Sequence, residues 1–232
     1  MDSIQGVVNE IRIFMYGGVV SLPLTISGTM LILGMFTGNY AMLFFLLGFL
    51  VITPIFVYLL NIPLNKIIPL IFELFSDDKF IAKNNSICSM SGSKGSDQIE
   101  VLSAWVAMIA FFIGYVFTNG IELYNHESPV TDKSAEENKA KVNNRKTQAI
   151  IGMISIIILL IVSLLYRYKS ECSSPISILL TFLLFSYGGY KWYKFLSVVG
   201  NNRLSDIFGI ANRLIAQSAI QNGPIACIPI KV

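Results

Sequence analysis

Residues 149–166 read AIIGMISIIILLIVSLLY, a run of apolar and small side chains that contains no charged residue. A helix needs about 20 such residues to cross the ~30 Å hydrocarbon core of a bilayer. Basic residues bound the run, Arg145 and Lys146 before it and Arg167 and Lys169 after it. The stretch therefore predicts a transmembrane helix whose charged flanks lie at the two membrane surfaces.

Four other parts of the chain show the same pattern. The five uncharged windows are Ile13–Phe36, Ala41–Leu60, Val101–Ile121, Ala149–Tyr166 and Ile176–Tyr190. Only the turn Thr37–Tyr40 separates the first two, which predicts a tight helical hairpin. Gly17, Gly18, Pro23 and Gly28 in the first window are interpreted as a smooth face against which the second packs closely, with a broken helix of the transporter kind as the alternative. The fifth window is short, with apolar sequence available to extend it as far as Phe195.

The composition agrees with a membrane protein and excludes several other classes. Of the 232 residues, 54% are hydrophobic and 13% charged, whereas a soluble domain has about 25% charged residues. The 17 basic and 14 acidic residues give a formal charge of +3, and the basic residues are scattered, so no nucleic-acid-binding stripe is predicted. The segment before the first window carries Asp2, Glu10 and Arg12, which is not the pattern of a cleavable signal peptide. We therefore expect an all-α, polytopic transmembrane protein with about five spans, including the first window.

Changes in composition divide the chain into six parts. Residues 1–60 hold the N-terminal segment and the transmembrane hairpin, 61–100 an interfacial segment and a Ser/Gly-rich loop, 101–121 the third span, 122–148 a polar charged loop, 149–190 the last two spans, and 191–232 a C-terminal helix with an apolar docking tail.

Two of these parts have features of their own. The apolar segment Ile62–Phe75 is too short to cross, and it is interpreted as interfacial, with a re-entrant hairpin as the alternative. Pro63 and Pro69 are expected to kink or interrupt any helix there. The charged loop, residues 122–148, is interpreted as solvated, with a nascent helix in its centre.

In the C-terminal part, Ser205 or Asp206 is positioned to cap a short helix that Gly223 and Pro224 end. The apolar segment Ile225–Val232 follows it. We expect that segment to dock on this protein, on the bilayer or on a neighbour.

Five spans place the two ends of the chain on opposite sides of the membrane. Side A then holds the N-terminus and the loops 61–100 and 167–175, and side B holds the hairpin turn, the loop 122–148 and the C-terminal tail. The basic residues on side A are Arg12, Lys66, Lys79, Lys83, Lys94, Arg167 and Lys169, and the other ten of the 17 lie on side B. The positive-inside rule therefore favours side B as cytoplasmic. Aromatic side chains near the window ends are expected to anchor in the headgroup layer; they are Trp105, Tyr166, Tyr168, Tyr190, Trp192 and Tyr193.

The sequence contains no recognisable catalytic, cofactor or metal site, and we expect a non-enzyme. His126 is the only histidine, and a metal site needs several convergent ligands. The five windows lack the ionisable residues that proton relays and ion-coupled transporters place inside the membrane. The hydroxyl side chains in the windows are expected to bond back to their own helices.

Cys88 and Cys172 both fall on side A in a five-span topology, whereas Cys227 falls on side B. A lumenal side A would permit a disulfide between the first two and glycosylation of Asn84 in the sequon Asn84-Asn85-Ser86. Two free loop thiols are the alternative.

Three stretches resemble a known group of proteins. Residues 17–60 read GGVVSLPLTISGTMLILGMFTGNYAMLFFLLGFLVITPIFVYLL, residues 105–124 read WVAMIAFFIGYVFTNGIELY, and residues 205–210 read SDIFGI. The combination resembles multi-pass internal-membrane proteins, or minor capsid proteins, of the nucleocytoplasmic large icosahedral DNA viruses, such as the chlorella viruses. The resemblance implies a structural component of a virion internal membrane derived from the host endoplasmic reticulum. Its implied partners are the bilayer and capsid or minor capsid proteins, reached through the side B loop and the C-terminal tail.

Two other functions stay open at the level of sequence. One is a small oligomeric channel or transporter, and the other is an accessory subunit of a large membrane complex. The uncharged windows favour a structural role over a transporter, and the sequence leaves a homo-oligomer open.

Overall fold

The computed structural model describes residues 6, 10, 17–73, 101–125, 135–169, 175–200 and 204–207. Its elements in that part of the chain are α2 (Leu22–Thr37), α3 (Tyr40–Leu46), the π-helix η1 (Leu47–Ile52), α4 (Thr53–Glu73), α5 (Ala104–Asn125), α6 (Ala135–Lys169) and α7 (Pro175–Val199). The predicted all-α class is confirmed for these residues.

Three helical segments are long and apolar enough to cross a membrane. They are Tyr40–Ile67, which runs through α3, η1 and α4, Ala104–Asn125 and Ala149–Tyr166. α2 is a shorter apolar helix, and α7 carries Lys191 and Lys194 in its last turns. The structure therefore supports a transmembrane class, and the count of five spans stays a prediction.

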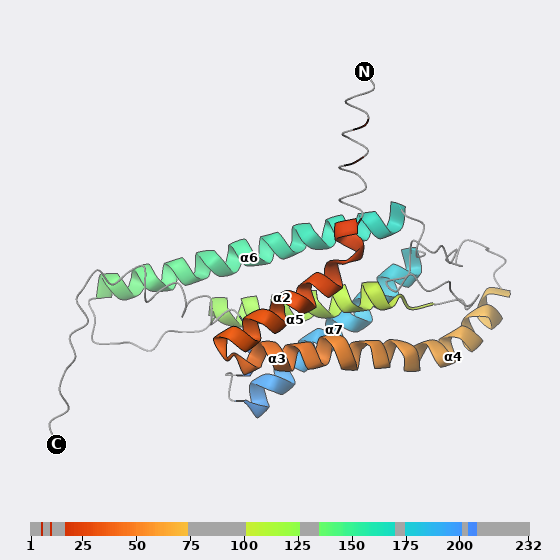
Figure 1. Cartoon of the computed structure of the whole chain (residues 1–232), viewed down its shortest axis with the longest axis horizontal. Coiled ribbons are helices and arrows are strands. Elements are labelled where there is room, and N and C mark those ends of the chain that lie inside the picture. The colour runs from red at the N-terminus through yellow and green to blue at the C-terminus, as the bar shows by residue number, and fades with distance from the viewer. Residues whose placement is uncertain are drawn as a thin grey trace.

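The helices form a bundle around α5 (Figure 1). About 72% of the apolar window of α5 is buried, against 33% of the window in α3–α4 and 11% of the window in α6. The core that surrounds α5 includes Phe45 and Phe49 from the second predicted span and Phe185 from α7. Successive helices run in opposite directions (Figure 1), so that the starts of α2, α5 and α7 and the ends of α4 and α6 share one end of the bundle.

Small residues let α5 and α7 approach closely. A Cβ atom added at Gly114 would lie far inside 3.0 Å of the Ser186 backbone, and one at Gly189 would do the same against the backbone of Phe111 and Tyr115. Such contacts are typical of transmembrane helix pairs, in which small side chains allow backbones to pack. The two glycines therefore allow the close crossing of α5 and α7.

The hairpin between α2 and α3 follows the prediction from the Thr37–Tyr40 turn. Gly38 takes the left-handed conformation (φ 65°) that ends α2, and the Asn39 side chain accepts a hydrogen bond from the Ala41 amide at the start of α3. A left-handed residue after a helix is ordinarily glycine, because glycine has no Cβ to clash there. The sequence thus specifies both the end of one helix and the start of the next.

The glycines of the first window do not pack as expected. A Cβ added at Gly17, Gly18 or Gly28 would meet nothing within 4 Å, whereas one at Gly34 would meet Met42 at 3.2 Å. α3 therefore contacts α2 near the hairpin turn and not along the earlier glycines. Pro23 lies at the start of α2, where its missing amide donor costs little.

The second predicted span ends later than Leu60, the end predicted from the sequence. α4 passes through Pro63 and Pro69 and continues to Glu73, so the prolines do not interrupt the helix. Figure 1 shows the last part of α4 bending away from the bundle, which is the kink that proline produces in a helix interior. The second predicted span and most of the segment Ile62–Phe75 thus form one helix.

The charged loop 122–148 contains more helix than its composition indicates. From Ala135 onward it belongs to α6, which runs without a break to Lys169. An existing helix is easy to extend, because only the first turn carries the cost of nucleation. The apolar window Ala149–Tyr166 therefore supports helical structure in the polar residues before it.

Several predicted features lie outside the described residues. These are Asn84, Cys88, His126, Cys172, Cys227, the docking tail Ile225–Val232 and most of the predicted C-terminal helix. Of that helix, the described part is a turn at Leu204–Ile207, in which Ile207 joins the core with 5% exposure.

Candidate functional site

Hydrogen bonds between separate segments gather at the end of the bundle that holds the starts of α5 and α7, which is the end predicted to lie on side A (Figure 1). Asn61 in α4 binds Leu102 twice, since its amide group donates to the Leu102 carbonyl at 3.1 Å and its oxygen accepts from the Leu102 amide at 2.9 Å. Ser177 at the start of α7 donates to the Val101 carbonyl. These bonds satisfy backbone groups just before α5, where no helical partner is available. We call this cluster the side A clamp.

A second cluster fixes the turn that follows α7. The hydroxyl of Tyr115, in the middle of α5, donates to the Ser205 carbonyl at 2.9 Å. The Tyr115 ring also meets the Tyr193 ring edge-on, with centroids 5.3 Å apart. Tyr115 and Ser205 are fully buried, so these contacts hold the Leu204–Ile207 turn against the bundle. We call this cluster the side B latch.

Two contacts of charged groups lie at the end of the bundle where α5 and α7 end, near the side B latch. Lys194 of α7 forms an ion pair with Glu122 of α5. The hydrogen bond that the Lys194 ammonium donates to Glu122 raises the pKa of Lys194 above its ordinary value, because the bond favours the charged ammonium. Lys146 of α6 lies over the Tyr124 ring at 5.1 Å, a cation–π contact between the two helices.

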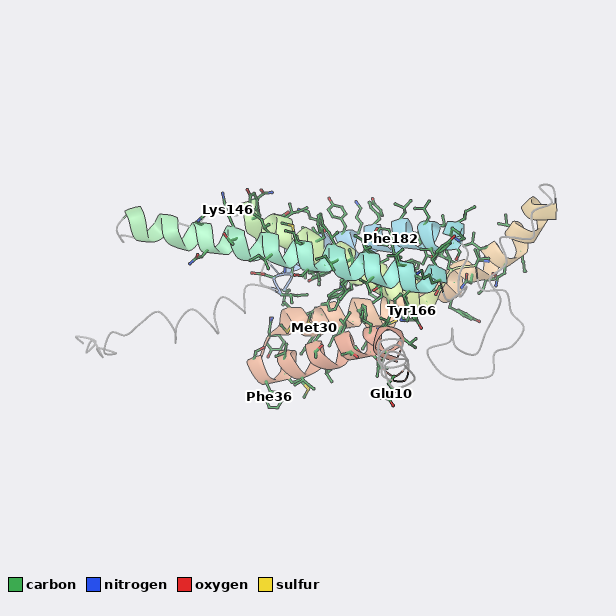
Figure 2. All side chains as sticks on the ribbon, turned by 90° about the horizontal axis from the view of Figure 1, so that it is seen from above. Glu10, Met30, Phe36, Lys146, Tyr166 and Phe182 are labelled. Carbon is green, nitrogen blue, oxygen red and sulfur yellow. The ribbon has the colours of Figure 1, made fainter. Side chains whose placement is uncertain are left out.

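The polar part of α6 projects past this end of the bundle. Figure 1 shows the start of α6 extending beyond the ends of α3 and α5. Residues 135–148 precede the apolar window, and at about 1.5 Å per residue they span roughly 20 Å. We call them the α6 arm. In Figure 2, Lys146 and Tyr166 mark the two ends of the apolar window, and the arm continues beyond Lys146.

Large apolar side chains cover the outside of the described helices. Soluble proteins rarely expose apolar patches larger than a few hundred Å². The exposed residues of this kind include Leu31, Ile32, Leu33 and Phe36 on α2, Leu47, Leu50, Val51, Ile55, Phe56 and Leu59 on η1 and α4, Ile151, Ile154, Ile158, Ile161 and Leu165 on α6, and Leu179 and Leu183 on α7. Figure 2 shows Phe36 pointing away from the bundle. Such a surface suits the hydrocarbon interior of a membrane.

The hydroxyl groups inside the windows behave as expected. Most of them donate to a carbonyl three to five residues earlier in the same helix; these are Ser21, Thr25, Ser27, Thr29, Thr53, Ser155 and Ser186. Two residues differ: Ser177 joins the side A clamp, and the buried Thr181 hydroxyl has no hydrogen-bond partner among the described residues. The prediction that these groups serve their own helices is confirmed for the seven.

The six predicted aromatic anchors separate into different environments. Trp105 is 2% exposed and donates to the Val20 carbonyl at 3.1 Å, and Tyr193 is 3% exposed. These two rings are enclosed by protein. Tyr166 and Trp192 are half-buried, and Tyr168 and Tyr190 are exposed. Headgroup anchoring stays a prediction for all six.

Three residues that organise contacts between the helices are not predicted from the sequence. Tyr115 and Asn61 are polar groups at buried helix contacts, and Gly48 borders the Trp192 ring. The signal for Asn61 was present, since it is a polar residue directly after an apolar window. Tyr115 gave no such signal, because its partner Ser205 is remote in sequence.

Among the described residues, no group of three or more His, Cys, Asp or Glu side chains is placed to hold a metal ion. Comparison of the chain with protein-family models, with curated proteins and with solved structures finds no match.

Proposed function

We propose that this chain is a structural, non-enzymatic membrane protein that anchors a bilayer to a protein shell on side B. Its α6 arm and C-terminal tail face that shell. In the form implied by the sequence resemblance, the bilayer is the internal membrane of a virion, derived from the host endoplasmic reticulum, and the shell consists of capsid or minor capsid proteins.

The observation that carries the proposal is the continuity of α6. One helix contains both an apolar window that is only 11% buried and the polar arm that precedes it. A continuous helix of this kind holds the start of the arm at a fixed distance, roughly 20 Å, from the bilayer. This geometry suits an anchor better than a loop of the same length, which would move freely.

The interior of the bundle supports a structural role over a channel. Aromatic rings fill the space around α5, with Phe45 in contact with Phe49, Phe111, Phe112 and Tyr115 at centroid distances of 5.0–6.1 Å. Most of the window hydroxyls are engaged within their own helices, as described above. A bundle packed in this way favours the anchor over the channel alternative.

Five crossings follow as part of the same proposal. α2 together with the helical residues 17–20 and α7 would supply the two crossings beyond the three apolar segments. At about 1.5 Å per residue, the 25 residues of α7 reach roughly 37 Å, which is enough to cross the hydrocarbon core. Lys191 and Lys194 would then lie at the side B surface.

Purification tests the anchor and its setting together. Mass spectrometry of purified particles should find the chain in a fraction that resists salt and alkaline extraction and is released by detergent together with shell proteins. Its absence from such particles, with presence in ordinary cell membranes, would contradict the viral setting.

A reconstitution experiment separates the anchor from the channel. Vesicles containing the purified chain should retain an entrapped dye and a salt gradient as long as protein-free vesicles do. Dye or ion flux proportional to the amount of protein would favour the channel alternative.

A further inference from the structure

The π-helix η1 lies in the second predicted span, and the Trp192 side chain of α7 packs against it. In η1 the Thr53 amide donates to the Gly48 carbonyl, five residues earlier, and the Thr53 hydroxyl donates to the same oxygen at 2.9 Å. The Trp192 indole N–H donates to the Phe44 carbonyl at 3.2 Å. A Cβ added at Gly48 would lie 2.5 Å from the Trp192 indole nitrogen, so the ring occupies the space that glycine leaves.

Pro54 explains why the helix widens at this point. Proline lacks an amide donor, and in an α-helix its ring clashes with the carbonyl four residues earlier, which here belongs to Leu50. A turn with bonds to the fifth residue changes the position of that carbonyl relative to the ring. Because η1 ends at Ile52, directly before Thr53 and Pro54, the widened turn lies where the clash would otherwise arise.

The widened turn changes which face of α4 meets α5. Buried residues Phe45, Phe49, Thr53 and Val57 recur at every fourth position, and Asn61 of the side A clamp continues the series. In a pure α-helix each step of four residues advances by about 40°, so Asn61 would be turned about 160° from Phe45. A π-turn accommodates one extra residue and removes about 100° of that rotation. Asn61 then remains on the side that reaches Leu102.

We infer that η1 is a rotational register lock, in which Trp192 of α7, seated against Gly48, holds the π-turn and thereby keeps Val57 and Asn61 of α4 facing α5. Pro54 places the turn in the sequence, and Trp192 fixes it in the bundle. The lock couples the side B half of α7 to the side A clamp, because displacement of the ring frees α4 to rotate. This inference does not depend on the proposed function.

The rotation can be measured with nitroxide labels in vesicles. Cys88, Cys172 and Cys227 are first replaced by Ser, and single cysteines are then labelled at residues 43–46 and 55–58. Oxygen collides less often with a label inside the bundle than with one facing lipid. The parent protein should show collision minima at Phe45 and at Val57, which are 0% and 4% exposed, and a high rate at Tyr58, which is 70% exposed.

The double variant P54A/W192A removes both determinants of the lock. With an α-helical turn in place of η1, each α4 residue takes the orientation of the residue after it in the parent. The second minimum should therefore move from Val57 to Phe56, one position closer to the minimum at Phe45. Minima that stay at residues 45 and 57 would overturn the inference.

A second measurement does not require the double variant to fold. The chain has two tryptophans, so a Trp105→Phe background leaves Trp192 as the only indole fluorophore. Gly48→Ala should shift its emission, because the added methyl group displaces the ring. Gly28→Ala is the matched control, since a Cβ there meets nothing within 4 Å. Equal emission in the Gly48→Ala variant and its parent would show that the ring is not seated in the π-turn.

Discussion

Tyr115 connects the centre of the bundle to the segment that follows α7. Its buried hydroxyl donates to the Ser205 carbonyl, and a buried carbonyl left without a donor is costly, by about 1–3 kcal/mol. The side B latch therefore joins Tyr115 to a partner 90 residues further along the chain.

Replacing Tyr115 with Phe removes this hydroxyl and keeps the ring. We expect Tyr115→Phe to weaken the docking of the Leu204–Ile207 turn by about 1 kcal/mol, because one buried hydrogen bond is lost. Hydrogen exchange at residues 204–207 measures the effect and should become faster. Tyr187→Phe is the control, since Tyr187 is 59% exposed. Equal exchange in the two variants would contradict the side B latch.

Asn61 has the corresponding role at the other end. Asn61→Ala removes two hydrogen bonds to Leu102, and we expect a loss of about 1–3 kcal/mol in the free energy of unfolding. Asn61→Asp retains an acceptor for the Leu102 amide but has no donor for its carbonyl. In detergent, the parent should therefore unfold at a higher temperature than either the Asn61→Asp or the Asn61→Ala variant. Variants as stable as the parent would show that the side A clamp is not needed for stability.

Helix packing depends on where the glycines lie more than on how many there are. Gly114 and Gly189 lie at the α5–α7 crossing, whereas Gly17, Gly18 and Gly28 border open space. Both groups occur in apolar windows, and the sequence alone does not distinguish them. The distinction requires knowledge of which helices are neighbours.

Two adjacent glycines of α7 test this crossing. Gly189→Ala should destabilise the bundle by about 1–3 kcal/mol or more, because the added Cβ overlaps the backbone of α5. Gly188→Ala should be close to neutral, since its Cβ would meet Phe111 at an ordinary 3.9 Å. Thermal unfolding of the two variants in the same detergent measures the difference. A Gly188→Ala variant at least as unstable as Gly189→Ala would contradict the packing.

The elements differ in how well the sequence predicts them. The hairpin at Gly38 and Asn39 was predictable, because both residues act through local backbone geometry. The helical α6 arm was not, because its own composition lacks an apolar stripe and its structure follows from the apolar window after it. The π-turn also escaped prediction, since Pro54 alone indicates a distortion and the partner Trp192 comes from a distant helix.

Across the whole molecule, polar and apolar groups occupy different places. The outer surface of the helices is apolar, and the interior contacts between elements at the two ends are polar. This is the arrangement expected of a bundle in lipid, where exposed side chains gain nothing from charge and helix ends meet water. The candidate surfaces for partners are then the ends, and above all the α6 arm.

The central claim is that the bundle crosses a membrane five times, with alternate helix ends on opposite sides. Single cysteines in a Ser background for Cys88, Cys172 and Cys227 test it through labelling by a membrane-impermeant maleimide in sealed vesicles of one orientation. We place one cysteine at each of the exposed positions Glu10, Lys66 and Lys169 on side A and Gly38, Asn143 and Val198 on side B. The account predicts that one group labels in intact vesicles and the other only after detergent is added. Labelling of the Val198 position in the same group as Lys66 and Lys169, or of the Glu10 position in the same group as Gly38, would contradict the five crossings.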